Sequence, residues 1–73
     1  MAMRDLTEYA RRVDGSTTLD EAQRNMIELI DQFQHKDKQQ LFKVFVQKRA
    51  SKASLQKWAW DLVLVGQGLK VHK

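Results

Sequence analysis

The placement of the residues that interrupt helices constrains this chain most. Its 73 residues include no proline, and its three glycines, Gly15, Gly66 and Gly68, stand where a helical pattern stops. Glycine and proline are the strongest punctuators of local structure, so the long stretches without them favour helices. A chain this short buries only about 60% of the surface that its unfolded form exposes, which leaves room for one small domain. The sequence therefore predicts an all-α fold, a small single-domain bundle of about four short helices.

Apolar residues recur at spacings of three and four, which places them on one face of each helix. Capping boxes, in which Thr or Asp precedes Glu or Gln by three residues, mark helix starts. The chain offers three of them: Asp5 with Glu8, Thr18 with Glu21, and Asp37 with Gln40. We expect helices at about residues 6–13, 19–33, 38–50 and 52–65. Together these helices predict a single helical domain over residues 1–66, followed by a basic tail at residues 67–73.

The third predicted helix has an apolar and a polar side. Its spacing predicts that Leu41, Phe42, Phe45 and Val46 point inward, and that Lys43, Gln47 and Lys48 point outward. The fourth predicted helix is apolar nearly all round, which is typical of a helix buried on more than one side. Either Ser51 or Ser54 can accept hydrogen bonds from the free amides at its start.

Trp58 and Trp60 stand two residues apart, so on a helix they point to roughly opposite sides. Large aromatic residues are mostly buried, and we expect one tryptophan against the second helix and the other under the first helix or the tail. The functional alternative makes Trp60, with Leu64 or Leu69, an exposed anchor for a partner protein.

The residue types argue against catalysis and against a bound metal or cofactor. The chain has no cysteine and two histidines, which cannot supply a zinc-finger ligand set. Glu28 and Asp31 are expected on a solvated helix face, and no motif places a serine or cysteine nucleophile beside His35. The longest apolar run covers residues 62–65, whereas a membrane span needs about 20 residues. We expect a cytoplasmic, non-enzymatic protein without a cofactor, a metal or a membrane partner.

The positive charge belongs to the second half of the chain. Residues 1–31 hold four basic and seven acidic residues, a net of −3, whereas residues 32–73 hold nine basic and two acidic, a net of +7. No acidic residue occurs between Lys38 and Trp60. A patch of this kind attracts a polyanion or an acidic protein surface; the alternative is a solvated face that keeps a small protein soluble. We name the five basic side chains within this stretch the basic corner, because we expect them to gather where the third and fourth helices meet: Lys43, Lys48, Arg49, Lys52 and Lys57.

Residues 39–60 resemble the helix-turn-helix of small phage and bacterial repressors. Ser51 has the position of the residue that caps the second helix, and Leu55 and Trp58 have those of its apolar anchors. Arg49 replaces the glycine usual in the turn. On this interpretation the side chains facing a DNA groove are Lys52, Ser54, Gln56 and Lys57.

Three arginines stand out in the acidic first half: Arg4, Arg11 and Arg12. They can pair locally with Asp5, Glu8 or Asp14, or recognise carboxylates or phosphates on a partner. With Trp60 they form the candidate protein-binding set.

A cysteine-free, basic, helical chain of 73 residues that begins Met-Ala-Met-Arg and carries two tryptophans near its end resembles the small bacteriophage regulators that bind host RNA polymerase. The resemblance implies a non-enzymatic transcription regulator that inhibits host initiation, promotes antitermination, or both, with the basic corner near RNA or DNA. Two alternatives stay open: a helix-turn-helix-like DNA-binding repressor, and a protein interaction module that binds no nucleic acid.

Overall fold

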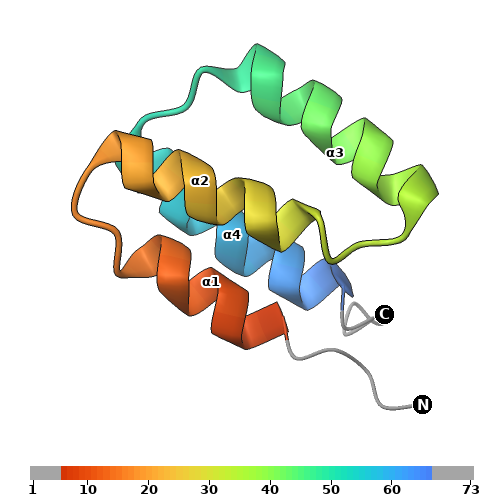
Figure 1. The fold of residues 1–73 in the computed structure, drawn as a ribbon, viewed down its shortest axis with the longest axis horizontal. Helices are drawn as coiled ribbons and strands as arrows, with labels where there is room; N and C mark the ends of the chain where they lie inside the picture. The colour runs from red at the N-terminus through yellow and green to blue at the C-terminus, as the bar shows by residue number, and fades with distance from the viewer. Residues whose placement is uncertain (1–5, 67–73) are drawn as a thin grey trace.

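The computed structural model describes residues 6–66, and this part of the chain contains four α-helices and no strand (Figure 1). Their bounds are Leu6–Asp14 for α1, Leu19–Ile30 for α2, His35–Lys48 for α3 and Lys52–Gly66 for α4. The prediction of a small all-α bundle of about four short helices is confirmed. None of these helices combines the length and the apolar composition that a bilayer crossing requires. The capping box at Asp5 and the tail at residues 67–73 lie outside the described residues.

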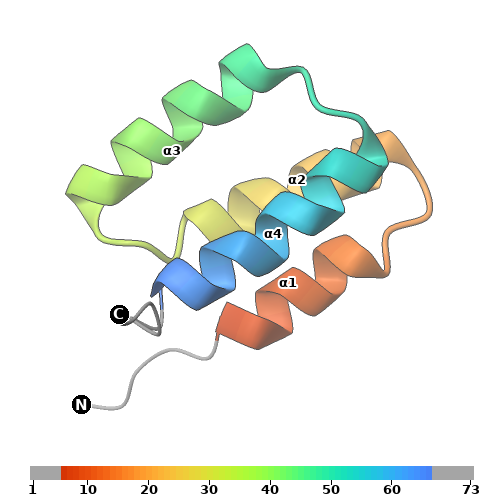
Figure 2. The same ribbon diagram turned by 180° about the vertical axis from the view of Figure 1, so that it is seen from behind.

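Helices α1, α2 and α4 form the core, and α3 lies outside it. α1, α2 and α4 pack against one another, whereas α3 stands apart along one side, as opposite views of the ribbon agree (Figures 1 and 2). No Cα atom of α3 lies within 8 Å of a Cα atom of α4. The buried apolar residues all belong to α1, α2 and α4: Leu6, Ala10, Val13, Ala22, Met26, Leu29, Ile30, Leu55, Ala59, Leu62 and Val63.

The starts of α2 and α4 follow from the side chains that cap them. The Thr18 hydroxyl accepts a hydrogen bond from the Glu21 backbone N–H at 3.1 Å, as the predicted capping box requires. The Glu21 carboxylate accepts from the backbone N–H of Thr17, the residue before the cap, at 2.8 Å, and this bond lowers the pKa of Glu21. Ser51 caps α4, because its hydroxyl accepts from the Ser54 N–H at 3.2 Å. Side chains just before each helix thus satisfy amides that the helix leaves free.

The connection between α2 and α3 differs from the prediction. α2 ends at Ile30 instead of residue 33, because the N–H groups of Gln32 and Phe33 donate to carbonyls only three residues back and form a tight turn. Phe33 still packs against the core from this turn, which is why the apolar pattern continues past the helix. α3 begins at His35, not at residue 38, so Asp37 lies in its first turn and does not cap it.

The connection between α3 and α4 is shorter than a helix turn and depends on Arg49. α3 ends at Lys48, two residues before the predicted end, because Arg49 adopts the left-handed conformation with φ 49° and ψ 43°. Arg49 is the one non-glycine residue with positive φ within residues 6–66. Glycine normally occupies such a position, since it carries no Cβ. An arginine therefore stands where the backbone alone would favour glycine.

Candidate functional site

α3 is held to the core by side chains. The rings of Phe45 on α3 and Trp58 on α4 stack with their centroids 6.4 Å apart and an angle of 14° between their planes. The Lys48 ammonium lies 5.5 Å from the centroid of the Trp58 ring, a cation–π distance. At the other end of α3, Lys38 Nζ lies 3.1 Å from the Asp31 carboxylate that follows α2. The helix is tethered at both ends without burying any residue.

The basic corner carries charges that the described part of the chain leaves uncompensated. Lys43, Lys48, Arg49 and Lys57 are exposed and Lys52 is half-buried. None of the five forms an ion pair with another residue in 6–66, where the two ion pairs present are Arg12 with Glu28 and Lys38 with Asp31. A partner that brings negative charge would therefore meet cations without competing carboxylates.

The five basic residues do not all share one face. Lys48, Arg49 and Lys52 lie at the connection between α3 and α4, as the sequence predicts. Lys48 turns toward α4, over Trp58, whereas Arg49 lines a hollow on the side of α2. Helical spacing places Lys43 on the side of α3 away from Phe45. The basic corner is therefore spread around the end of α3, and it offers charge to more than one side of that helix.

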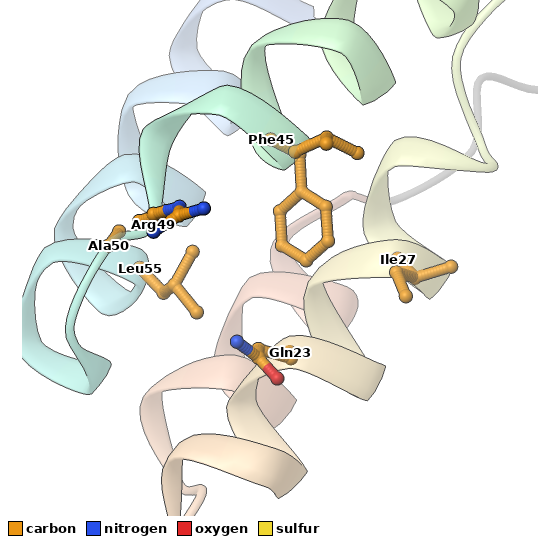
Figure 3. A pocket seen from close by; sticks show the side chains of 7 residues that line it. Gln23, Ile27, Phe45, Arg49, Ala50 and Leu55 are labelled. Atoms are coloured by element: carbon orange, nitrogen blue, oxygen red, sulfur yellow. The ribbon is translucent and has the colours of Figure 1, made fainter.

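A groove opens between α2 and α3 beside the basic corner. Its volume is about 240 Å³. Figure 3 shows Phe45 pointing from α3 toward α2, with Gln23 and Ile27 across the space. Val46, predicted to point inward, is 72% exposed, which corrects that expectation. Leu41, Phe42 and Phe45 pack against the core, and Val46 lies at the edge of the face that they form. The lining residues, which define the α2/α3 groove, are Gln23, Ile27, Phe45, Val46, Arg49, Ala50 and Leu55.

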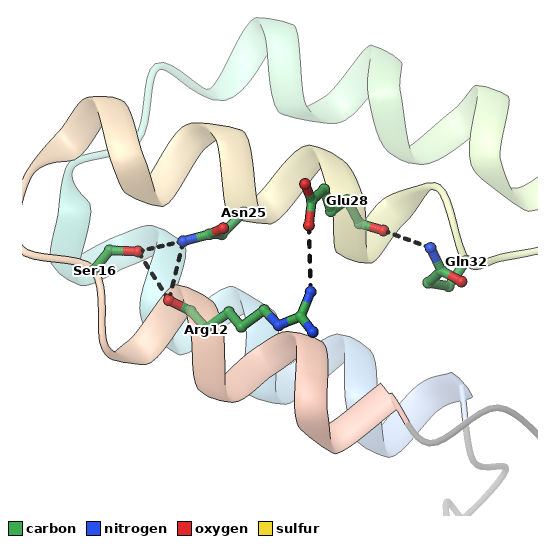
Figure 4. A network of polar contacts seen from close by, with 5 residues as sticks. All are labelled: Arg12, Ser16, Asn25, Glu28 and Gln32. Carbon is green, nitrogen blue, oxygen red and sulfur yellow. Dashed lines mark hydrogen bonds and ion pairs between the residues drawn. The ribbon is translucent and has the colours of Figure 1, made fainter.

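Arg12 forms an ion pair between two helices at the surface. Its guanidinium lies 3.5 Å from the Glu28 carboxylate of α2 (Figure 4). It also lies 5.1 Å from the centroid of the Tyr9 ring. The partner is thus on another helix, and not among the local carboxylates that the sequence suggested. Arg11 is exposed on α1, and Arg4 lies outside the described residues.

A polar network ties the end of α1 to the other core helices. The Arg12 carbonyl accepts from the hydroxyl of Ser16 at 3.0 Å and from the amide of Asn25 at 3.1 Å (Figure 4). The Gln56 side chain of α4 donates to the Val13 and Asp14 carbonyls at 3.3 and 3.0 Å. The Ser16 N–H also donates to the Val13 carbonyl, at 3.1 Å. Ser16 and the side-chain amides of Asn25 and Gln56 thus supply donors to carbonyls that the end of a helix leaves free.

The position of Gln56 bears on the helix-turn-helix interpretation. That interpretation needs Gln56 to face a DNA groove, whereas its amide is committed to the end of α1. Lys52, Ser54 and Lys57 remain at the surface to differing extents. Arg49 and Ser51 do match the motif, as a left-handed turn residue and a helix cap. The resemblance to a helix-turn-helix therefore holds for the turn. It does not extend to the two helices, because α3 does not pack closely on α4.

Both tryptophans are half-buried and contact the core from α4. Trp58 stacks on Phe45 of α3, a contact that the spacing of the two tryptophans did not indicate. α4 is apolar on nearly all sides but is not buried on all of them, because Leu64 and Val65 are 55% and 61% exposed. Trp60 thus lies at an edge of the core, four residues before the exposed Leu64.

Gln23 and Ile27 line the groove, although no motif in the sequence marks them as functional residues. A sequence signal that could have indicated an uncovered side of α2 is that Ile27 is apolar although it adjoins the stripe formed by Met26, Leu29 and Ile30. Within residues 6–66, no group of three or more histidine or acidic side chains is placed to hold a metal ion. Comparisons with protein-family models, with curated proteins and with solved structures found no match to this chain.

Proposed function

We propose that this protein is a non-enzymatic transcription regulator that binds bacterial RNA polymerase through the basic corner, in the cytoplasm of the bacterial cell. The supporting observation is the set of five basic side chains that no carboxylate within residues 6–66 neutralises. Together they confer a strong attraction for an acidic protein surface or for nearby nucleic acid. Polymerase is the partner to which the resemblance to phage regulators points, and inhibition of initiation or antitermination is the outcome that it implies.

The arrangement of the molecule supports a binding role of this kind. Every buried apolar residue belongs to α1, α2 and α4, and the basic side chains Lys43 and Lys48 of α3 are exposed, so α3 can present charge to a partner. Arg11 and Trp60, with Arg4, stay candidates for a second protein contact, because Arg11 is exposed and Trp60 is only half-buried. Arg12 is the least suited member of that set, since its guanidinium pairs with Glu28.

A DNA-binding repressor is the second candidate, and one observation favours it. Arg49 takes the backbone conformation of the turn, and Ser51 caps the helix that follows it. The commitment of Gln56 to α1 counts against this candidate. If it were correct, the pure protein would retain duplex DNA in a gel shift, and its affinity would fall steeply with salt.

Capture of polymerase from a nuclease-treated bacterial lysate tests the proposal. We expect the immobilised wild-type protein to retain the core subunits of RNA polymerase, identified by mass spectrometry. Lys43→Glu and Lys57→Glu should each reduce the retained polymerase about tenfold, because each reverses a charge at the surface that meets the partner. Lys36→Glu is the matched control, since Lys36 is also exposed on α3 but lies outside the basic corner.

If the wild-type protein retains no polymerase subunit, the proposal is wrong. If Lys36→Glu reduces capture as much as Lys43→Glu and Lys57→Glu do, the net charge of the protein determines polymerase binding, and the basic corner has no special role. Capture of the protein by duplex DNA alone, at an affinity that Lys52→Ala lowers, would support the repressor instead.

A further inference from the structure

The α2/α3 groove combines apolar walls with an opening to solvent. Ile27 on α2 is 42% exposed and Val46 on α3 is 72% exposed, although both line the same hollow. Leu55 of α4, which is 1% exposed, also lines it. Apolar side chains that face a hollow from two helices are typical of grooves that receive side chains of a partner.

The size of the groove limits what it can receive. Its volume is about 240 Å³. A cavity of about 150 Å³ lined by aliphatic side chains is enough to hold benzene. The groove therefore has room for one large apolar side chain, such as phenylalanine or leucine, and not for a drug-sized ligand or a cofactor.

Arg49 gives the groove its charge. It is the one ionisable residue in the lining, and it forms no ion pair within residues 6–66. Figure 3 shows its side chain at the end of the groove where α3 meets α4, beside Ala50 and Leu55. A guanidinium beside an apolar hollow favours a carboxylate next to an apolar side chain, because its donors match the two oxygens of the carboxylate.

We propose that the α2/α3 groove binds a single large apolar side chain of an acidic segment in a partner protein, and that Arg49 pairs with a carboxylate beside this side chain. The inference rests on the proposed function in one respect, since it specifies how an acidic protein surface would be recognised. It adds a specific anchor to the general attraction of the basic corner, and it makes Val46 and Arg49 the residues that select the partner.

A second copy of this chain is the competing occupant. On α4, the exposed Asp61 precedes the exposed Leu64 by three residues, which also puts a carboxylate beside an apolar side chain. Insertion of this part of α4 into the groove of another copy would join two different surfaces, and such contacts continue into open chains unless a ring closes. A partner protein with a complementary acidic segment avoids this, and self-association becomes an outcome of the test.

Binding of defined peptides to the full chain tests the inference. The probe is a blocked 14-residue helical peptide of alanine and glutamine with one central phenylalanine flanked by glutamates. One matched peptide carries lysines in place of the glutamates, and another carries alanine in place of the phenylalanine. We expect the first peptide to shift the NMR signals of Ile27 and Val46, and to bind about tenfold more tightly than either control peptide.

Variants of the protein locate the site. Arg49→Gly removes the guanidinium while glycine suits the left-handed backbone, so loss of binding cannot be attributed to unfolding. Val46→Glu adds a repelling charge at an exposed position, and Gln47→Glu is its matched control on another face of α3. We expect the first two to weaken binding of the glutamate peptide at least about fivefold, and Gln47→Glu to leave it unchanged within about twofold.

The inference is overturned if the lysine peptide binds as well as the glutamate peptide, or if Val46→Glu and Arg49→Gly leave binding unchanged. Concentration-dependent sedimentation of the protein alone, abolished by Val46→Glu, would assign the groove to a second copy. If polymerase capture depends on Lys57 but not on Val46, the proposed function stands and this inference fails. If the peptide binds in the groove but the wild-type protein captures no polymerase, the inference stands and the proposed function fails.

Discussion

α2 and α3 are neighbouring helices of similar length, 12 and 14 residues, and both show apolar residues at helical spacing. They are held very differently. α2 buries Ala22, Met26, Leu29 and Ile30, whereas α3 buries no residue. The difference shows that helical spacing defines which side chains share a face, but the neighbours decide whether that face is covered. Stability is therefore expected to depend on α1, α2 and α4, and binding on α3.

The comparison also explains how a short chain can present so many charges. Burial of apolar surface is the main favourable term in folding, and here it is concentrated in three helices. The basic residues Lys36, Lys43 and Lys48 of α3 are exposed, so their substitution is expected to cost little stability. Elements that bind partners often belong to the less stable parts of a protein.

The largest expected effect comes from the core side of the comparison. Leu29 on α2 is fully buried, and Leu29→Ala should lower the free energy of unfolding by about 2 to 5 kcal/mol through lost burial and the cavity left behind. Leu41→Ala removes the same atoms from the half-buried side of α3 and should cost only about 1 kcal/mol. Urea unfolding followed by far-UV circular dichroism measures both. Equal losses would show that α3 contributes to the core as much as α2 does.

Removal of the Phe45 ring should loosen α3 in particular. Phe45→Ala removes the stacking on Trp58, and we expect a loss of about 1 to 2 kcal/mol. With Phe45→Ala placed in a Trp60→Phe background, Trp58 is the one tryptophan left. Its emission should shift to longer wavelength at a lower urea concentration than the concentration at which the helical signal is lost. Coincident transitions would instead mean that α3 and the core unfold as one unit.

Gln56→Ala tests the polar side of the core. The variant leaves the Asp14 carbonyl without the side-chain donor that serves it, and it should cost about 1 kcal/mol. Gln47→Ala is the control, because Gln47 is exposed on α3, and it should stay within about 0.5 kcal/mol of the wild type. The same urea titration compares them, and a Gln56→Ala variant as stable as Gln47→Ala would contradict the role assigned to this amide.

The smallest effect concerns pH and the start of α2. The hydrogen bond from the Thr17 N–H lowers the pKa of Glu21 below its ordinary value of 4.5. The stability that the ionised Glu21 side chain contributes is therefore present above pH 4.5, and it is lost as the pH falls through the lowered pKa. Wild-type stability should thus decrease more than that of Glu21→Gln between about pH 6 and pH 3. Parallel pH profiles of the two proteins in thermal unfolding would contradict this.

The predictable parts of this molecule are those with local causes. The start of α2 follows from Thr18 and Glu21, and its buried face follows from the spacing of Met26, Leu29 and Ile30. The class of fold follows from the absence of proline and the position of the glycines. Local patterns suffice here because caps and helix faces are formed by residues within a few positions of one another.

The remaining features depend on residues far apart in the sequence. The pairing of Arg12 with Glu28 and the donation from Gln56 to α1 link separate helices, which no spacing rule reveals. The exposure of Val46 depends on where the neighbouring helices lie, which the spacing of residues along α3 does not reveal. The groove is likewise lined by residues of α2, α3 and α4 that lie far apart in the sequence.

Hydrogen–deuterium exchange tests the central claim most directly, with the full chain measured alone and bound to RNA polymerase core enzyme. In the free protein, the amides of α3 should exchange faster than those in the middle of α2 and α4. In the complex, we expect protection to increase in α3 and in the first turns of α4. Protection confined to α1, or no change in α3, would contradict the account.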